Sequence, residues 1–448
     1  MTPATPPPAA PPPPVDIAAL TIGSPKRNAR EEIGWHGFFP YYAGYPHSFA
    51  DKLIESAALP AGVTILDPWN GSGTTTYSAA EHGFLAEGWD VNPVMVIIAR
   101  ARLLPLSEAD MLGPLARDTV SRVRADQRRL LDGDPLLSWF ERPVAALIRG
   151  VEIRIREQLV GATTFGDDGA HVERMSAIAA TFYVALFSVC RDLVTRFQAS
   201  NPTWLRKPKA GETLISCDRE TLLSGFIAAI DLMASSLEAR TQAIGPMRPI
   251  RTNLGVVDTA LAKPAANSID LILSSPPYCT RIDYSAATRI ELAILYPRLR
   301  LSMEVLGRTM IGSTRVPKAE LSPREVWGDT CLDFLVQLKR HPSKASDGYY
   351  YKTHLDYFDK MARSLEALAP ALRPGAAAIL VVQDSFYKEI HNDLPTIIGE
   401  MGVAAGLTLA RRVDFASARS MSGINPYTRI YKRKGGALEA VLCFQKPA

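Results

Sequence analysis

The chain has 448 residues, and its 50 Lys and Arg residues nearly balance 46 Asp and Glu residues, for a formal net charge of +4. Hydrophobic residues make up 47% of the chain and charged residues 21%, which excludes a collagen-like or wholly disordered protein. At roughly 150 residues per domain, the length predicts two or three domains. A net charge this small does not by itself indicate a nucleic-acid-binding protein, because the local distribution of charge decides that.

Cysteine usage and hydropathy indicate a reducing compartment. The chain has 5 cysteines with no CxxC pair, which predicts neither a disulfide framework nor a zinc site. No apolar signal region opens the sequence, and the uncharged run Met175 to Cys190 is shorter than the roughly 20 residues that span a bilayer. The histidines show no metal-ligand spacing. We therefore expect a cytoplasmic protein that uses no metal and no membrane.

Residues 1–24 are rich in Pro and Ala, which predicts an extended, disordered tail, with a Pro-rich docking motif as the alternative. A β-α-β unit follows. Its strands are Val63–Leu66 and Phe84–Trp89, and a helix precedes it at Ser48–Leu59. A glycine-rich turn joins the first strand to a helix that ends near Gly83.

Residues 105–245 have the pattern of helices almost throughout, which predicts a helical insertion and a candidate DNA-recognition lobe. The expected helices are Leu115–Leu131, Pro143–Leu159, Val172–Phe197 and Glu220–Ala243.

The α/β pattern resumes near residue 250, with a helix at Leu355–Leu372 and the turn Arg373–Gly375. Further buried strands are expected at Ile269–Ser274, Ala377–Gln383, Thr408–Phe415 and Leu438–Gln445. Residues 25–104 and 246–448 together predict one α/β domain with a doubly wound, mostly parallel sheet.

The turn Asp67–Thr75 has the composition of a cofactor-binding loop. Gly71 and Gly73 allow close backbone approach to a ligand, and Asp90 follows at the tip of the second strand, where an acid can hold ribose hydroxyls. No Lys follows the glycines, which disfavours a P-loop, and Asp67 would repel a pyrophosphate. A cationic, phosphate-free ligand such as S-adenosylmethionine (SAM) fits better, and a purely structural turn is the alternative.

A second motif, Ser274–Tyr278, comes at the carboxyl end of a buried strand, where open α/β sheets bind ligands. Together, Asp67-Pro68-Trp69-Asn70-Gly71-Ser72-Gly73-Thr74-Thr75 and Ser275-Pro276-Pro277-Tyr278 resemble the SAM-binding and catalytic motifs of DNA amino-methyltransferases, in the Ser form most associated with N4-cytosine enzymes. Tyr45–Phe49 resembles the family's N-terminal motif near the methionine end of SAM, and Val257-Asp258 resembles its adenine-binding motif.

This resemblance implies a Rossmann-like class I methyltransferase that uses SAM. The catalytic residues it implies are Ser275, Pro276, Pro277 and Tyr278. The cofactor-binding residues expected from it and from the turn are Phe49, Asp67, Pro68, Trp69, Gly71, Gly73, Thr74, Asp90, Asn92 and Asp258. The family's common Phe after Asp-Pro is Trp69 here, and the helical block interrupts the motifs at an unusual place, so the segment that reads the target is not assigned by the resemblance.

The motif also has a physical rationale. An exocyclic amine is a poor nucleophile, and hydrogen-bond acceptors such as Ser275 Oγ and the Pro276 carbonyl can polarise it during in-line attack on a methyl group. Tyr278 offers a ring on which a flipped base can stack. Cys279 is expected to be a packed residue, because a ring-carbon methyltransferase would need a Pro-Cys nucleophile.

Basic segments with aromatic or amide side chains predict where DNA binds, with solvated helix ends as the alternative. They are residues 191–209, 281–318 and 411–434. The candidate contacts are Asn201, Trp204, Arg206, Lys207, Arg281, Tyr284 and Arg308.

We therefore expect an enzyme that methylates the exocyclic amine of a DNA base, most simply N4 of cytosine, by base flipping and direct transfer. The alternatives are N6-adenine methylation in DNA, amino-methylation of RNA or tRNA, and a non-catalytic SAM- or DNA-binding subunit. By analogy, the biological setting is restriction-modification or phage defence with a cognate partner.

Overall fold

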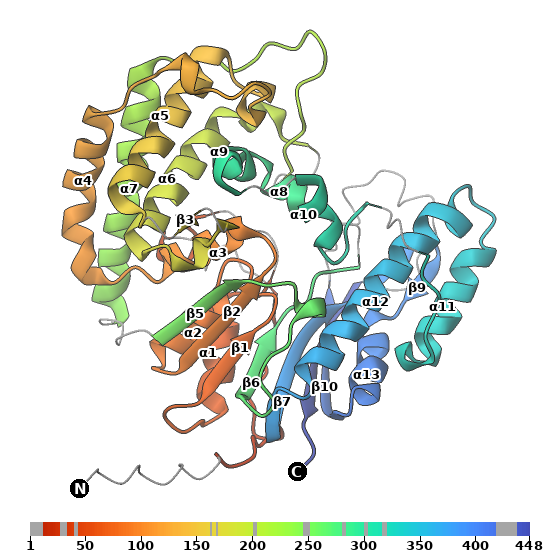
Figure 1. Cartoon of the computed structure of the whole chain (residues 1–448). Helices are drawn as coiled ribbons and strands as arrows, with labels where there is room; N and C mark the ends of the chain where they lie inside the picture. The colour runs from red at the N-terminus through yellow and green to blue at the C-terminus, as the bar shows by residue number, and fades with distance from the viewer. Residues whose placement is uncertain are drawn as a thin grey trace, which may run out of the picture.

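The fold is built on a seven-stranded sheet in the order β10-β11-β7-β6-β1-β2-β5 (Figure 1). We describe it from a computed structural model covering residues 12–26, 34–39, 44–161, 164–166, 169–199, 204–244, 251–279, 284–299, 303–315, 320–417 and 437–448. The strands are β1 (Thr64–Asp67), β2 (Leu85–Asp90), β5 (Arg251–Val256), β6 (Ile269–Ser274), β7 (Leu372–Gln383), β10 (Thr408–Ser417) and β11 (Ala437–Gln445). Only β11 runs against its neighbours within this sheet.

Helices cover both faces of the sheet. Ile65, Leu271 and Ile379 point to one face, where they pack with α1 (His47–Ser56) and α2 (Thr74–Glu81). Alternate residues such as Leu66 and Ile272 point to the other face, which is covered by α12 (Tyr351–Leu368) and α13 (Leu394–Ala404), with α11 (Asp329–Arg340) packed on these two helices. The expected doubly wound, mostly parallel α/β fold of Rossmann-like type is therefore confirmed.

The first β-α-β unit follows the sequence pattern closely. Gly73 adopts a left-handed φ of 84° and initiates α2, which ends at Glu81 and is followed by the C-cap His82 and by Gly83 at φ 80°. Asn92 caps α3 (Pro93–Arg102) by accepting a hydrogen bond of 3.1 Å from the Val94 amide. The strand at Leu85–Asp90 lies one residue later than predicted.

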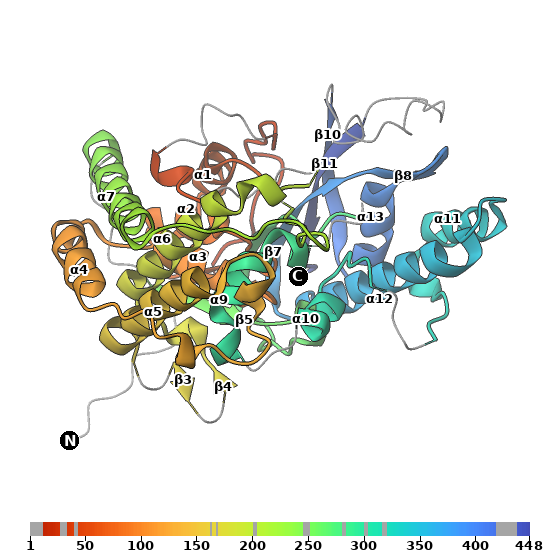
Figure 2. The same ribbon diagram turned by 90° about the horizontal axis from the view of Figure 1, so that it is seen from above.

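The predicted helical block forms a helical lobe beside the sheet (Figures 1 and 2). It contains α4 (Ala109–Ser121), α5 (Arg142–Leu159), α6 (Ala177–Leu193) and α7 (Arg219–Ile244), with a short hairpin of β3 (Phe165–Gly166) and β4 (Gly169–Ala170). The helix expected at Leu115–Leu131 ends at Ser121. Ser176 caps α6, so that helix begins later than predicted.

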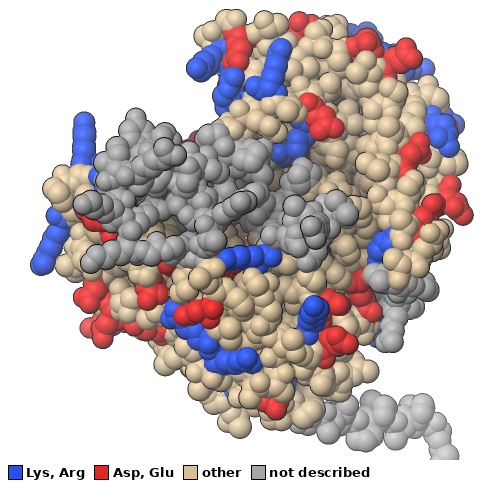
Figure 3. All heavy atoms as spheres, turned by 180° about the vertical axis from the view of Figure 1, so that it is seen from behind, with Lys and Arg blue, Asp and Glu red and all other residues tan. Residues whose placement is uncertain are grey.

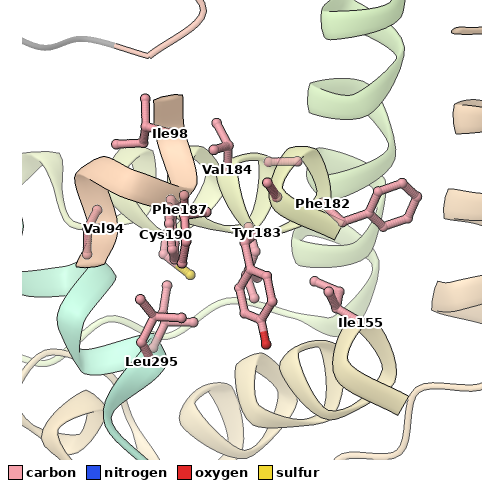
Figure 4. Close-up of a cluster of buried hydrophobic side chains, with 14 of the residues drawn as sticks. Val94, Ile98, Ile155, Phe182, Tyr183, Val184, Phe187, Cys190 and Leu295 are labelled. Carbon is pink, nitrogen blue, oxygen red and sulfur yellow. The ribbon is translucent and has the colours of Figure 1, made fainter. Parts of the chain in front are cut away.

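The lobe shares its core with helices of the α/β part of the chain. Helix α6 lies at the centre, between α3, α5, α7 and α9 (Arg289–Leu299), and most of its side chains are fully buried (Figure 4). The labelled contacts in that core come from Val94, Ile98, Ile155, Phe182, Tyr183, Val184, Phe187, Cys190 and Leu295. Because α9 follows the loop Ser275–Tyr278 in sequence, this core joins the lobe to the segment after that loop.

Helix α7 has an unusual composition for its position. Among the described residues, Arg219–Ala243 is the one helix long and apolar enough to cross a membrane, with a mean hydropathy of 1.5. Its buried side chains, including Leu222, Phe226 and Ile230, follow helical spacing and belong to the lobe's core. This packing is that of a core helix with one face in solvent.

The N-terminal segment corrects one prediction. Residues 12–24 were expected to be part of a disordered tail, but Val15, Ile17 and Leu20 are buried against the sheet. The Val15 amide donates a hydrogen bond of 3.1 Å to the Gly375 carbonyl, and Arg411 donates to carbonyls of residues 17–20. Apolar residues after the last proline supply this packing. Residues 1–11 lie outside the described part of the chain.

Other differences concern element ends and short strands. Helix α12 ends at Leu368, and β7 already begins at Leu372, so the expected turn Arg373–Gly375 lies within a strand with an irregular register. Strand β5, whose residues alternate weakly in polarity, was not predicted. A hairpin of β8 (Ser385–Tyr387) and β9 (Ile390–Asn392) was also not predicted.

Candidate active site

Two adjoining cavities open at the carboxyl ends of β1, β2 and β6, where the strand order reverses. The larger has a volume of about 750 Å³, including the part open to solvent, and the smaller about 350 Å³. Gly44, Trp69 and Ser275 line both. The larger is also lined by Pro68, Asp90, Val91, Asn92, Met95, Val257, Asp258, Thr259, Pro276, Pro277, Tyr278, Thr288, Thr309, Met310 and Ile311.

Asp67 lies at the floor of the smaller cavity, at the end of β1, and is 4% exposed. Its Oδ2 accepts a hydrogen bond of 2.6 Å from Thr75 Oγ1, and its Oδ1 accepts from Ser274 Oγ and from the Trp69 amide. Burial raises the pKa of Asp67 to about 6, although these hydrogen bonds oppose that shift. Asp67 thus ties β1, β6 and α2 together beneath the cavity.

Tyr45 connects the segment before α1 to this carboxyl group. Its hydroxyl lies 2.6 Å from Thr75 Oγ1, the same oxygen that donates to Asp67. Tyr45 is buried, and desolvation holds its pKa well above the ordinary value, so it stays protonated. Tyr45 and Gly44 both line the smaller cavity, which places this segment over the glycine-rich turn.

Asp90 lies at the tip of β2 and faces the larger cavity. Its Oδ2 accepts from the Gly71 amide at 3.0 Å and its Oδ1 from the Asn92 amide at 2.8 Å. Burial nevertheless raises the pKa of Asp90 to about 7. Asn92 in turn donates from Nδ2 to Thr288 Oγ1 at 2.8 Å, so the turn after β2 is bonded to the segment that leads into α9.

Asp258 reaches the same cavity from the end of β5. It caps the 3₁₀-helix η7 (Thr259–Leu261) by accepting from the Ala260 amide at 3.0 Å. The neighbouring Thr259 donates from Oγ1 to the Pro68 carbonyl at 2.6 Å. The acid after β5 is therefore fixed against the turn after β1.

The loop Ser275–Tyr278 leaves β6 and lines the larger cavity along its whole length. Ser275 Oγ donates to the Val381 carbonyl at 3.1 Å, which leaves its lone pairs available to accept from a ligand. The Tyr357 hydroxyl of α12 donates to the Pro277 carbonyl at 2.8 Å. A hydrogen bond from Tyr278 partly offsets the burial that raises the pKa of Glu439 on β11.

The charged side chains that line the cavities, among the described residues, are all acidic. Among the described residues, no Lys or Arg lines either cavity, whereas Asp67, Asp90 and Asp258 do. Trp69 Nε1 is buried without a hydrogen-bond partner in the described part of the chain, and it belongs to a side chain shared by both cavities. Such walls fit a cationic ligand with an aromatic ring and hydroxyl groups, and they do not fit a phosphate-bearing one.

The cavities include most, but not all, of the residues expected to bind the cofactor. All four of Ser275–Tyr278 line them, and so do the expected cofactor residues other than Phe49 and Gly73. Phe49 is 4% exposed and packs behind Tyr45 in the core. A Cβ at Gly73 would lie 2.7 Å from Ala99 Cβ, so this glycine serves the contact between α2 and α3. Phe49 and Gly73 were expected to bind the cofactor, but neither lines the described cavities.

The residues expected to contact DNA are partly neutralised by acids and partly outside the described residues. Arg206 is paired with Glu212 at 2.7 Å and Arg308 with Glu304 at 2.7 Å, so a glutamate neutralises the charge of each arginine. Lys207 is exposed and Trp204 is half-buried. Asn201 and Arg281 lie outside the described residues, as does the side chain of Tyr284. The basic region 411–434 is described only to residue 417.

A polar cluster near α1 and α2 was not expected. His47, Asp51 and Glu81 bring potential metal-ligand atoms within 4.8 Å of one another. Glu81, however, already binds His47 at 2.5 Å and the Arg240 guanidinium, which would repel a metal ion. Burial and the neighbouring His47 lower the pKa of His36, stacked on His47, to about 3. These contacts join α1 and α2 to α7.

Several cavity residues had no signal in the sequence. Thr288 and residues 309–311 line the larger cavity from the segments around α8 (Tyr284–Ala287) and α10 (Met303–Thr309). Neither segment carries a local motif, and only the packing of α9 on the lobe brings Thr288 to Asn92. Met95 of α3 faces the cavity only because Asn92 starts that helix there.

Comparison with known proteins shows a distant similarity and no family assignment. No protein-family model matches the chain. The chain is similar to the Type II methyltransferase M.BsoBI of Geobacillus stearothermophilus, with 20% identity over 280 residues. The match covers 58% of this chain and 52% of that protein, so it spans about half the length of the relative.

Proposed function

We propose that the protein is a SAM-dependent methyltransferase that acts on the exocyclic amino group of a base in DNA. The observation that carries the proposal is that Ser275–Tyr278 and Asp90 line one cavity at the reversal point of the sheet, with no cation among its described walls. The similarity to a Type II methyltransferase supports the same activity.

The walls fit the proposed cofactor part by part. Asp90 can accept hydrogen bonds from ribose hydroxyls, and Trp69, Val91 and Val257 offer apolar surface to an adenine ring. The smaller cavity, with Asp67 and the Gly71 backbone, suits the methionine end, because its acid attracts an α-ammonium group. When bound, SAM supplies an electrophilic methyl group.

The chain's own residues would orient and polarise the acceptor. Ser275 Oγ, whose hydrogen points to the Val381 carbonyl, accepts a hydrogen bond from the amine, and the Pro276 carbonyl serves as a second acceptor. Both increase electron density on the amine nitrogen as it attacks in line. Tyr278, held by Glu439 at its far end, stacks on the extruded base.

The target base and setting belong to the same proposal. The Ser form of the loop favours N4 of cytosine, with N6 of adenine as the second candidate. The helical lobe over residues 105–245 is the candidate recognition lobe, and restriction-modification with a cognate nuclease or another defence partner is the proposed setting. Amino-methylation of RNA and a non-catalytic role are the competing functions.

The test is methyl transfer by the full chain from labelled SAM to duplex DNA and to RNA, followed by mass spectrometry of the nucleosides. We expect N4-methylcytosine from DNA. N6-methyladenine in its place would show that adenine, the second candidate, is the target base. Transfer to RNA alone would overturn the assignment of DNA as the substrate. The absence of transfer to either nucleic acid would favour a non-catalytic binding subunit.

Paired substitutions test the site. Ser275→Ala and Tyr278→Ala should each lower the rate of transfer at least about 100-fold, the effect of losing a transition-state hydrogen bond or the stacking partner. Ser121→Ala and Tyr296→Ala change the same residue types at exposed positions outside the cavities and should leave the rate unchanged. Full activity of the first pair would disprove the site.

A further inference from the structure

We infer that a basic surface around the end of α11 binds the DNA backbone beside the catalytic cavity; this inference rests on the proposed function. The surface, here called the α11–η9 surface, is formed by the end of α11, the π-helix η9 (Ser346–Tyr350), the start of α12 and the turn of the β8–β9 hairpin. It is distinct from the three basic segments that the sequence singles out. Its basic residues are Lys339, Arg340, Lys344, Lys352 and Lys388.

The charge of this surface is largely unneutralised. Lys339, Arg340, Lys344 and Lys352 are exposed, and none has an acidic partner among the described residues. The acids within the surface are Asp347 and Glu389, and Glu389 is bonded to His341 at 2.8 Å. This contrasts with Arg206 and Arg308, each of which is paired with a glutamate.

Aromatic side chains are interleaved with these cations. Tyr349, Tyr350 and Tyr351 are consecutive, and each is half-buried. Lys339 Nζ lies 5.4 Å from the centre of the Tyr351 ring, and Lys388 Nζ lies 5.8 Å from that of Tyr387. Cations alternating with aromatic groups are typical of surfaces that track a nucleic-acid backbone.

The surface is held in a defined shape. Ser343 Oγ lies 2.8 Å from the Tyr387 hydroxyl, which fastens the loop after α11 to the hairpin. The rings of Tyr350 and Tyr387 are 4.7 Å apart. Because the basic side chains project from this packed support, they form a fixed site and not a flexible tail.

The surface also lies close to the proposed chemistry. The Tyr349 hydroxyl donates at 2.6 Å to the carbonyl of Thr314, which follows the cavity residue Ile311 by three positions. Lys352 precedes Tyr357 by five residues on α12, about 8 Å at 1.5 Å per residue, and Tyr357 holds the Pro277 carbonyl. Duplex DNA carries one charge per about 1.7 Å of axis, so phosphates flanking a base in the cavity would fall within this reach.

The face of the molecule opposite to that of Figure 1 carries mixed charge. On the face seen from behind, basic and acidic side chains are interspersed over the described surface (Figure 3). A polyanion would find attraction and repulsion side by side there. The α11–η9 surface combines an excess of cations with proximity to the cavity, and this combination favours DNA as its partner.

The test compares two triple variants of the full chain. Lys339→Ala/Lys344→Ala/Lys352→Ala removes three charges from the surface, and Lys52→Ala/Arg122→Ala/Lys263→Ala removes three exposed charges elsewhere. Binding to a labelled 30-base-pair duplex is measured by fluorescence anisotropy at several salt concentrations. We expect the first variant to lower the salt slope of log K by about 2 to 3, at roughly 0.9 per phosphate contact, and to weaken binding at least about tenfold.

The outcomes separate this inference from the proposed function. Equal effects of the two triple variants, while the unmodified chain methylates DNA, would overturn the inference alone. Weaker binding of an RNA duplex with unchanged binding of DNA would overturn the choice of DNA. The affinity for SAM should be the same in all three proteins, and loss of that affinity in the first variant would show that the surface supports the cavity instead.

Discussion

The Tyr357 hydroxyl donates a hydrogen bond of 2.8 Å to the carbonyl oxygen of Pro277, in the middle of the proposed catalytic loop. Tyr357 is 1% exposed, and its helix packs on the sheet, so the loop is held by a rigid element. A second constraint comes from Gly312, where a Cβ would lie 2.9 Å from the Tyr278 carbonyl oxygen. The position of the loop is thus set from outside the motif.

Removing this hydroxyl tests whether Tyr357 is a positioning residue. Tyr357→Phe should lower kcat about tenfold, equivalent to about 1.4 kcal/mol, and leave the affinity for SAM unchanged, because it displaces the loop and not the cofactor walls. Steady-state kinetics and SAM titration measure the two effects. Tyr183→Phe removes another buried hydroxyl, bonded to Glu152 in the lobe at 3.2 Å, and should leave kcat unchanged. An equal loss of kcat in both variants would argue against a specific role.

The buried ion pair between Arg149 and Asp134 should be important for stability. Arg149 donates to both carboxylate oxygens of Asp134 at 2.8 and 2.9 Å and also to the carbonyls of Ala293 and Ile294. Pro297 within α9 has no amide hydrogen for the Ala293 carbonyl, so Arg149 supplies the missing donor. Arg149→Met should lower the free energy of unfolding by about 3–5 kcal/mol, because it leaves a buried carboxylate without its partner.

Urea denaturation measures this loss, with Arg122→Ala as the control. Arg122 also pairs with an aspartate, Asp118, at 2.9 Å, but its side chain is 62% exposed. Its removal should change stability by no more than about 1 kcal/mol. A loss below about 1 kcal/mol for Arg149→Met would show that the pair is not a structural anchor.

Two glycine-to-alanine changes should have opposite signs. Gly73→Ala forces a side chain into a left-handed backbone with φ +84° and against Ala99, so it should destabilise the fold by about 1–3 kcal/mol. Gly225→Ala, within α7, would meet only ordinary contacts at 3.6 and 3.7 Å, so it should stabilise the fold by up to about 1 kcal/mol. Melting temperatures check the signs, and a stabilising Gly73→Ala would contradict the packing described here.

Asp90 predicts a pH dependence of stability. Its pKa is raised in the fold to about 7 from about 4 in an unfolded chain, so the folded state binds the extra proton between these values. Stability should therefore fall as pH rises from about 4 to about 7, and Asp90→Asn should remove part of that fall. Urea midpoints measured across this range test it. An unchanged profile in the variant would show that Asp90 does not titrate in this range.

The same groups predict that the affinity for SAM rises with pH. A bound cation and ribose hydroxyls favour ionised Asp67 and Asp90, so binding should release protons near pH 6 to 7. Calorimetry in buffers of different ionisation enthalpy measures the release directly. Asp90→Asn should reduce it, whereas Asp16→Asn, in the segment before α1 and outside both cavities, should not. The same release in Asp90→Asn as in the unmodified chain would contradict the assigned role.

Short motifs predicted the floor of the site well because they are local. Asp67 and Asp90 end β1 and β2, Ser275 directly follows β6, and parallel strands end at one edge of the sheet. Phe49 and Gly73 belong to the motifs but do not line the cavities, because motif membership does not show which way a residue faces. Thr288 and Met310 were missed because only tertiary packing brings them to the cavity.

Charge along the sequence was a weaker guide than the cavity motifs. Arg206 and Arg308 counted as positive residues in their segments, but each is neutralised by a glutamate four to six residues away. Four of the five cations of the α11–η9 surface lie within residues 339–352, against the single acid Asp347, so this basic window was visible in the sequence and was missed. Similarly, Val15 to Leu20 were grouped with the prolines that precede them, although Val15, Ile17 and Leu20 pack in one apolar cluster with residues of α1, β7 and β11.

The sheet order has a consequence for synthesis of the chain. Ile65 of β1 pairs with Leu271 of β6, which is made 206 residues later. At about 5–20 residues per second, one edge of β1 stays open for roughly 10–40 s while the helical lobe emerges. The lobe's contacts are more local, so we expect it to assemble first and the apolar edge of the β1–β2 pair to need chaperone protection until β6 arrives.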